Sequence, residues 1–245
     1  MPKSYKITLP NFFEPEIFNH EVNLTKQMHL PETVPGPETK LRKSLDQLNV
    51  ADFEGFLIDH EYTVNIQGRL YEDGALFNKF IAKSQIKAYR SQEKEVLLLC
   101  GKKADILDFC RQTRIMPQIK LSVIQIDMDA LQEKLPEVRG VWFRSTAGYI
   151  RARAYMGNQI QDTPEYITAK NEGQISTLSF YFEDARSGRP HPILITEDGA
   201  VVLQGTYEST DQELDFVMYV KSQLLDGIYK VIDVKTAKES VSGLA

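Results

Sequence analysis

The chain has 245 residues, of which 42% are hydrophobic and 26% are charged, a composition typical of globular proteins with one large or two smaller cores. The net charge of −5 argues against a protein that binds nucleic acid through overall positive charge, although it permits a local basic face. No apolar run approaches the roughly 18 residues that span a membrane, and the first residues lack a signal-peptide core. We therefore expect a cytoplasmic protein without a membrane partner.

The first part of the chain divides at the break Pro35-Gly36-Pro37. Residues 1–36 are rich in proline and polar residues, which predicts an N-terminal arm that packs on the body or stays partly disordered. Leucines at three- and four-residue spacing then predict a helix over 38–48, and two apolar runs predict strands over 56–59 and 62–66.

A second helix is expected over residues 76–90, where apolar side chains recur at helical spacing. Lys79, Lys83 and Lys87 follow one another at intervals of four on the opposite side. This ridge fits a solvated helix face, and it also fits a contact with nucleic-acid phosphates.

The middle of the chain alternates short strands and helices. The patterns predict strands over 96–100, 119–126, 141–144 and 149–155, helices over 104–112 and 130–135, and a polar connection over 157–175. Asp127 and Asp129, between the strand 119–126 and the next helix, fit a divalent-cation site or a helix cap. Both interpretations stay open.

Residues 139–153 form a basic and aromatic segment without a single acidic residue. Its side chains of interest are Arg139, Trp142, Arg144, Tyr149, Arg151 and Arg153. Arginine can grip phosphate with two hydrogen bonds, and aromatic rings can stack on unpaired bases. The segment therefore predicts a two-stranded nucleic-acid contact. The alternative is that Trp142 belongs to the core and the arginines pair with carboxylates.

The stretch from Leu178 to Leu225 gives the clearest local architecture. Phe180 and Phe182 alternate with polar neighbours, as in a half-buried strand. Asp198-Gly199 between two apolar runs indicates a hairpin, and Ser209 or Thr210 can cap the amphipathic helix that follows.

The order hairpin, glycine, capped helix over residues 193–225 resembles a repeat of the TATA-binding-protein-like fold. The matching positions are Ile193–Ile195, Gly199, Val201, Val202, Gly205, Ser209 and the helical stripe. The resemblance implies a curved antiparallel sheet backed by helices, a shape that binds nucleic acid in some proteins and serves as a protein platform in others. It transfers no binding residue to this chain, because the binding elements of that family have no matching positions here.

A weaker internal similarity suggests two related halves. Leu107-Asp108-Phe109 and Leu214-Asp215-Phe216 each follow a strand that ends in glycine. Chance similarity of two strand–turn–helix units is the alternative. The predicted division is an arm over 1–36, α+β halves over 37–117 and 118–235, and a flexible tail over 236–245.

The sequence shows no clear catalytic set. Gly101-Lys102-Lys103 lacks the spacing of a phosphate loop, and the four histidines lack zinc-ligand spacing. His60, between Asp59 and Glu61, fits either an acid/base group or a solvated strand end. Cys100 and Cys110 are expected to be buried thiols. We therefore predict neither a cofactor nor a metal.

Two classes of function remain from the sequence. The first is a non-catalytic protein that binds nucleic acid through a basic and aromatic strand pair on an antiparallel sheet. The second is a protein-interaction or regulatory subunit, with a protein partner or a homo-oligomer, which the acidic net charge favours. A nuclease or nucleotidyl transferase built on Asp127 and Asp129 is a third, more distant alternative.

Overall fold

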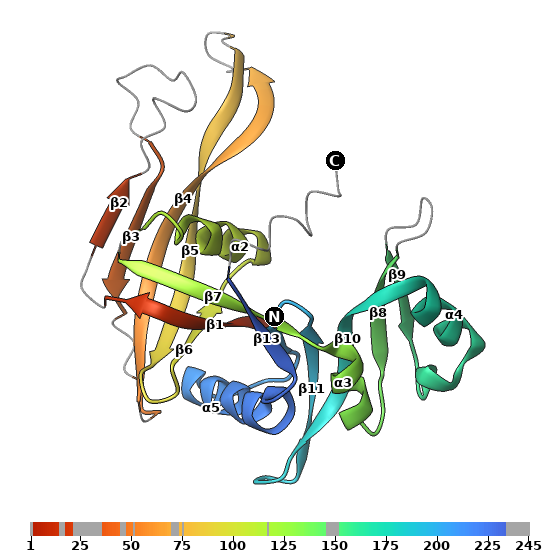
Figure 1. Cartoon of the computed structure of the whole chain (residues 1–245). Helices are drawn as coiled ribbons and strands as arrows, with labels where there is room; N and C mark the ends of the chain where they lie inside the picture. The colour runs from red at the N-terminus through yellow and green to blue at the C-terminus, as the bar shows by residue number, and fades with distance from the viewer. Residues whose placement is uncertain are drawn as a thin grey trace. The chain divides into compact units, whose positions relative to one another are not determined.

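The computed structural model describes residues 2–14, 18–21, 36–44, 48–50, 52–69, 74, 76–116, 118–145 and 152–233. The fold is mixed α+β, with antiparallel strand pairs and helices packed on them (Figure 1). Contacts divide the chain into two compact units. Unit 1 comprises Met1–Leu9, Leu48–Ala51 and Ser122–Ala245, and unit 2 comprises Pro10–Gln47 and Asp52–Leu121. The predicted tail over 236–245 lies outside the described residues, whereas part of the predicted arm forms strand β1 (Lys3–Phe13).

Unit 2 is built on a meander of antiparallel strands. Its elements are β2 (Phe18–Glu21), β3 (Glu38–Lys43), β4 (Phe53–Arg69), β5 (Leu76–Ser91), β6 (Val96–Cys100) and the helix α2 (Lys103–Gln112). The two longest strands, β4 and β5, pair from Phe53 opposite Ser91 to Arg69 opposite Leu76. Helix α2 lies on one face of this pair, where Ile58, Ile86 and Phe109 are fully buried.

Two helices expected in unit 2 are strands, so those predictions were wrong. Residues 76–90 belong to β5, and residues 38–43 form β3. In both segments the buried side chains alternate with exposed ones, as Ile86 and Ala88 alternate with Lys87. Pairing with β4 buries this alternating set, and that long-range gain outweighs the local helical spacing.

Unit 1 is likewise built on antiparallel strand pairs. Its strands follow in the order β1, β12 (Ala200–Leu203), β11 (Arg189–Thr196), β10 (Gly173–Asp184), β8 (Gly140–Ser145) and β9 (Ala152–Met156). Two further strands, β7 (Ile119–Ile126) and β13 (Tyr229–Asp233), pair with each other. The helices of this unit are α3 (Met128–Lys134), a short η1 (Ile160–Asp162), α4 (Pro164–Glu172) and α5 (Thr210–Val220), which continues as a π-helical turn, η2 (Lys221–Leu225).

The alternation along β10 places these helices on one face of the sheet. Leu178 and Phe180 are buried, and Phe182 contacts Phe216 and Tyr219 of α5. On the neighbouring strand β8, Phe143 lies on this same face. Its ring is 5.4 Å from that of Tyr166 on α4, and Tyr166 in turn donates a hydrogen bond to Gln132 on α3. The side chains between these positions therefore point to the opposite face.

Local signals were confirmed at the hairpin and the helix start. Strands β11 and β12 pair on either side of Asp198-Gly199, and Gly199 has a φ of +80°, a conformation that favours glycine. A Cβ atom at Gly199 would lie 2.4 Å from Cγ1 of Ile124, so no larger residue fits there without a shift. The Ser209 hydroxyl accepts a hydrogen bond from the Gln212 amide and caps α5.

The predicted polar connection over 157–175 was wrong, because it contains η1 and α4. Thr163 caps α4 by accepting a hydrogen bond from the Tyr166 amide, and Pro164 occupies its first turn. Only two side chains of α4, Tyr166 and Ala169, are buried. So narrow an apolar stripe leaves little periodicity to detect in the sequence.

A buried carboxylate joins the first strand to the last helix of unit 1. Glu213 of α5 accepts a hydrogen bond of 2.5 Å from the Tyr5 hydroxyl and bonds of 2.7 and 2.8 Å from the Lys3 ammonium. Glu213 is only 5% exposed, so these three hydrogen bonds replace the water that its charge would otherwise need.

We expect Glu213→Ala to lower the free energy of unfolding by about 1–3 kcal/mol, because it leaves Tyr5 and Lys3 without their acceptor. Urea unfolding followed by circular dichroism measures this change. Glu208→Ala, at an exposed position just before the same helix, is the matched control and should change stability little. Equal unfolding midpoints for both variants would contradict the role assigned to Glu213.

Candidate nucleic-acid interface

The face of the unit 1 sheet opposite its helices carries the main candidate site. Strand pairing places Met156, Gly140, Ser179, Leu194 and Val202 side by side in one row across five strands. A second row contains Ala154, Trp142, Thr177 and Thr196. We call this surface the helix-free face, since α3, α4 and α5 pack on the other side of these strands.

Trp142 lies at the centre of the helix-free face. Its side chain is half-buried, and its ring lies over Gly140, where an added Cβ would come within 3.1 Å of the indole. The absence of a side chain at Gly140 therefore leaves the space that the six-membered ring of the indole occupies. The side chain is thus mostly buried but not fully enclosed. The predicted alternative, in which Trp142 belongs to the core and the arginines pair with carboxylates, is confirmed for Arg144 and Arg153.

Two arginines flank the tryptophan on this face. The Arg139 guanidinium lies 5.3 Å from the centre of the Tyr181 ring, and Tyr181 is 53% exposed. Arg139 also bonds to Asn158 and lies 3.4 Å from Glu137. Arg144 forms an ion pair with Glu197. The Arg144 side chain is 49% exposed, so a phosphate in solution can reach its guanidinium and compete with Glu197.

Arg153, a further residue of the predicted strand pair, does not join this surface. Arg153 lies opposite Phe143, on the helix-covered face, and its guanidinium is 2.6 Å from Glu172 of α4. This ion pair raises the pKa of Arg153. Tyr149 and Arg151 lie outside the described residues. The antiparallel pairing of β8 with β9 was confirmed, but it separates Arg153 from Arg144 and Trp142.

The lysine ridge belongs to unit 2. Lys79, Lys83 and Lys87 lie on the outward face of β5, since residues four apart share a face in a strand as well as in a helix. Lys83 lies 3.7 Å from Glu61 on the paired strand. The three lysines therefore share one face, as predicted, but they lie on a strand and not on the predicted helix.

Tyr181 was missed as a binding candidate. The alternation of Phe180 with Tyr181 on a half-buried strand was visible in the sequence. Its proximity to Arg139 was not, because that contact depends on the register of β10 against β8.

A cluster in unit 2 contains the residue types of a catalytic triad, but its hydroxyl and imidazole are buried. The Thr39 hydroxyl lies 3.0 Å from His60 Nδ1, and His60 Nε2 lies 3.2 Å from a carboxylate oxygen of Asp108. Thr39 and His60 are almost completely buried, so no substrate can reach them. We interpret the chain as a structural link between β3, β4 and α2. Both expectations for His60 were wrong, because its sequence neighbours Asp59 and Glu61 pair on the opposite face and the ring is not solvated.

Other sequence candidates take structural roles. The Asp127 carboxylate accepts a hydrogen bond of 3.1 Å from the Ala130 amide and caps α3, and Asp129 pairs with Lys170. Within the described ranges, no group of three or more histidine, cysteine, aspartate or glutamate side chains is arranged to hold a metal ion. In the same part of the chain, no helix is long and apolar enough to cross a membrane.

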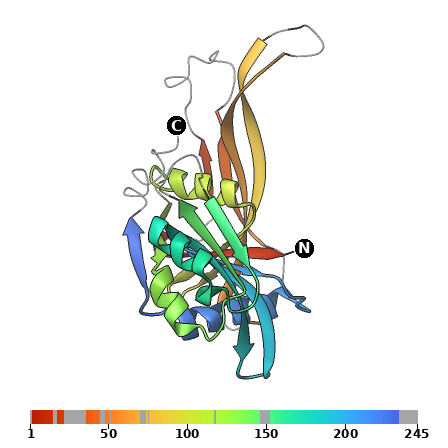
Figure 2. The same cartoon turned by 90° about the vertical axis from the view of Figure 1, so that its right-hand side faces the viewer.

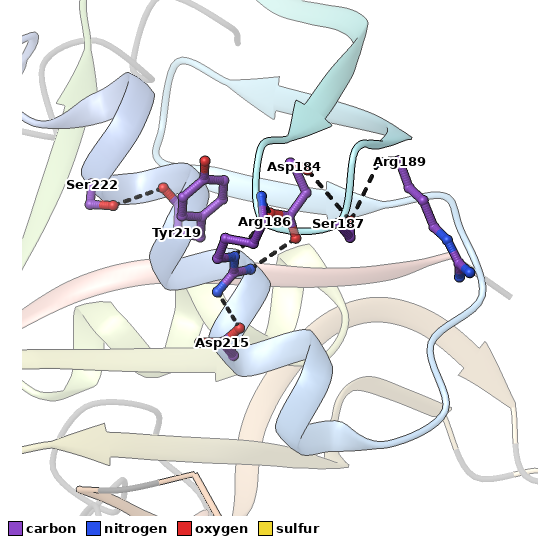
Figure 3. Close-up of polar contacts among 7 residues, drawn as sticks. All are labelled: Asp184, Arg186, Ser187, Arg189, Asp215, Tyr219 and Ser222. Atoms are coloured by element: carbon purple, nitrogen blue, oxygen red, sulfur yellow. Dashed lines mark hydrogen bonds and ion pairs between the residues drawn. The ribbon is translucent and has the colours of Figure 1, made fainter.

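An ionic cluster fixes the β10–β11 turn to α5 (Figure 3). Arg186 donates to both carboxylate oxygens of Asp184, at 2.9 and 3.0 Å, and to Asp215 at 2.6 Å. Its guanidinium also lies 4.3 Å from the centre of the Tyr219 ring. The hydrogen bonds from Arg186 hold the pKa of the Asp184 carboxyl below its usual value. All three nitrogens of the guanidinium donate to the carboxylates of Asp184 and Asp215, and the group lies over the Tyr219 ring. We therefore interpret the cluster as structural.

Comparison with known proteins gives no relative for this chain: no protein-family model and no curated protein matches it.

We expect Arg186→Gln to lower the free energy of unfolding by about 1–3 kcal/mol at pH 7, because it leaves the Asp184 charge without its partner. The pKa of Asp184 is lowered in the folded state, so its contribution is present above the unfolded carboxyl pKa of about 3.9 and is lost as the pH falls through the folded value. The difference between wild type and variant should therefore shrink below about pH 4.

Thermal unfolding at pH 7 and at low pH measures this dependence. Arg189→Gln is the control, since the Arg189 side chain points away from the cluster in Figure 3. A destabilisation by Arg186→Gln that stays constant with pH would contradict the ionic role.

Proposed function

We propose that this protein binds nucleic acid without catalysis, through the helix-free face of the unit 1 sheet. The observation that carries the proposal is the partly exposed indole of Trp142, with Arg139 and Arg144 beside it on the same face. An aromatic ring lying on a sheet offers a platform on which an unpaired base can stack, and the arginines can meet the adjoining phosphates.

The fold adds support of a general kind. An antiparallel sheet with helices on one face leaves the other face available to a ligand, as single-strand-binding modules do. The proposed resemblance of residues 193–225 to the TATA-binding-protein-like fold is compatible with this use of a sheet, and with its use as a protein platform. Since fold alone does not give function, the proposal depends on the residues of the face.

The charge of the chain limits the mode of binding. A net charge of −5 repels a polyanion at long range, so we expect affinity to come from contacts at the face rather than from overall attraction. Single-stranded nucleic acid suits this mode better than duplex, because its bases are available for stacking.

A second candidate function is a protein-interaction subunit. It is favoured by large apolar side chains that are exposed on unit 2, chiefly Ile66, Leu76 and Phe80. This surface lies in the other unit.

We expect Trp142→Ala to weaken the binding of a single-stranded oligonucleotide by about tenfold or more, since stacking on one aromatic ring is worth about 1–3 kcal/mol per base. Fluorescence anisotropy at low and moderate salt measures the affinity. Arg144→Ala should weaken binding and reduce the slope of log affinity against log salt by about 0.7, the value for one phosphate contact on a single strand.

Arg153→Ala is the matched control, because Arg153 lies in the same strand pair but on the helix-covered face. It should leave affinity unchanged in a protein whose melting temperature shows that it is folded. Equal losses for Arg144→Ala and Arg153→Ala would exclude this face as the site, and no binding by the wild type at low salt would exclude the function.

The lysine ridge provides an independent check. If Lys79, Lys83 and Lys87 also contact phosphate, their joint replacement by alanine should lower affinity and salt dependence without affecting the discrimination between single strand and duplex. Loss of binding only in this triple variant would move the site to unit 2.

A further inference from the structure

The β4–β5 hairpin continues beyond the strands that flank it. Strand β3 pairs with β4 only as far as His60, and β6 pairs with β5 only as far as Lys87. Figures 1 and 2 both show the hairpin extending past these neighbours. We call residues 61–69 and 76–83 the distal hairpin. Within the described chain it is a two-stranded ribbon, and such ribbons are at best marginally stable in water.

The two faces of the distal hairpin differ in character. On one face, which we call the distal apolar face, Tyr62 lies opposite Ala82 and Val64 lies opposite Phe80. On the other face, Glu61 lies opposite Lys83 and Asn65 lies opposite Lys79. The apolar face continues toward the tip with Leu76, while Ile66 stands beside it at a bulge in β4.

The distal apolar face extends the core of unit 2 past its covering helix. Nearer the base, the same face contains Ile58 and Ile86, which are fully buried. Helix α2 ends this covered region at Tyr62, whose hydroxyl donates a hydrogen bond of 2.9 Å to Asp105. Beyond it, Phe80 is 42% exposed, Ile66 53% and Leu76 80%. Exposed apolar surface of this kind marks an interaction site.

We propose that the distal apolar face binds the same face of a second copy of this chain. The proposal is independent of the proposed nucleic-acid function. Phosphate and anionic lipid would engage the lysines, which lie on the opposite face, and would leave the apolar side chains in water. Burial of the distal apolar face requires a partner whose surface is also apolar. A second copy has such a surface, because a two-fold axis brings the same face of both chains together.

Charge favours an antiparallel arrangement of the two hairpins. Arg69 lies at the tip, opposite Leu76 and on the apolar side, whereas Asp108, whose side chain is 31% exposed, lies on α2 at the other end of the same face. Seven residues of strand separate Tyr62 from Arg69, a span of about 23 Å. If the two hairpins stack about a two-fold axis near Val64, the Arg69 of each copy lies toward Asp108 of the other. The lysine faces of both hairpins then point outward into water.

The test is the mass of the full chain by analytical ultracentrifugation over a range of concentrations. We expect a species of twice the 28.0 kDa mass of one chain. Phe80→Asp and Leu76→Asp should each raise the dissociation constant by about tenfold or more, because a charge would be buried in the interface. Arg69→Glu should weaken the dimer most at low salt.

Ile81→Asp is the matched control. Ile81 neighbours Phe80 on the same strand and is 38% exposed, but it lies on the lysine face opposite Thr63. It should leave the dimer intact, and circular dichroism confirms that each variant is folded. A monomeric wild type overturns the proposal, as does equal dissociation by Ile81→Asp and Phe80→Asp. A dimer that forms without binding oligonucleotides would leave this inference standing and exclude the proposed function.

Discussion

The two-residue alternation along β10 is the constraint on which unit 1 depends. Leu178 and Phe180 must be buried, so the helices α3, α4 and α5 gather on their side of the sheet. The same alternation leaves Ser179 and Tyr181 on the helix-free face. Core and candidate interface are thus two consequences of one pattern, because a strand cannot bury one set of side chains without presenting the other.

Hydrogen-bonded charged side chains also hold elements of unit 1 together. Glu213 ties β1 to α5, and Arg186 ties the β10–β11 turn to the same helix. Glu213 receives its donors from Lys3 and Tyr5, at the other end of the chain, and Arg186 bonds both to Asp184 beside it and to Asp215 on α5. Such contacts add specificity to the packing, since only the native arrangement satisfies them.

Basic residues that are close in the sequence do not form a single basic surface in this fold. Arg144 and Arg153 belong to one acid-free segment, yet strand pairing places them on opposite faces, and only Arg144 joins Trp142. In unit 2 the lysines and the exposed apolar side chains of the distal hairpin are likewise separated by its two faces. Strand pairing thus places the basic and the apolar side chains of the distal hairpin on separate surfaces.

The sequence by itself determined the local elements whose signals are short-range. It gave the strand 119–126, the hairpin at Asp198-Gly199, the cap at Ser209 and the basic segment that contains Trp142. It could not distinguish helix from strand over 76–90, because lysines four residues apart share a face in either structure. Only the tertiary structure decided that segment, the face that Arg153 occupies and the contact of Arg139 with Tyr181. All three depend on which strands pair and in what register, and that choice is set by burial between residues far apart in the chain.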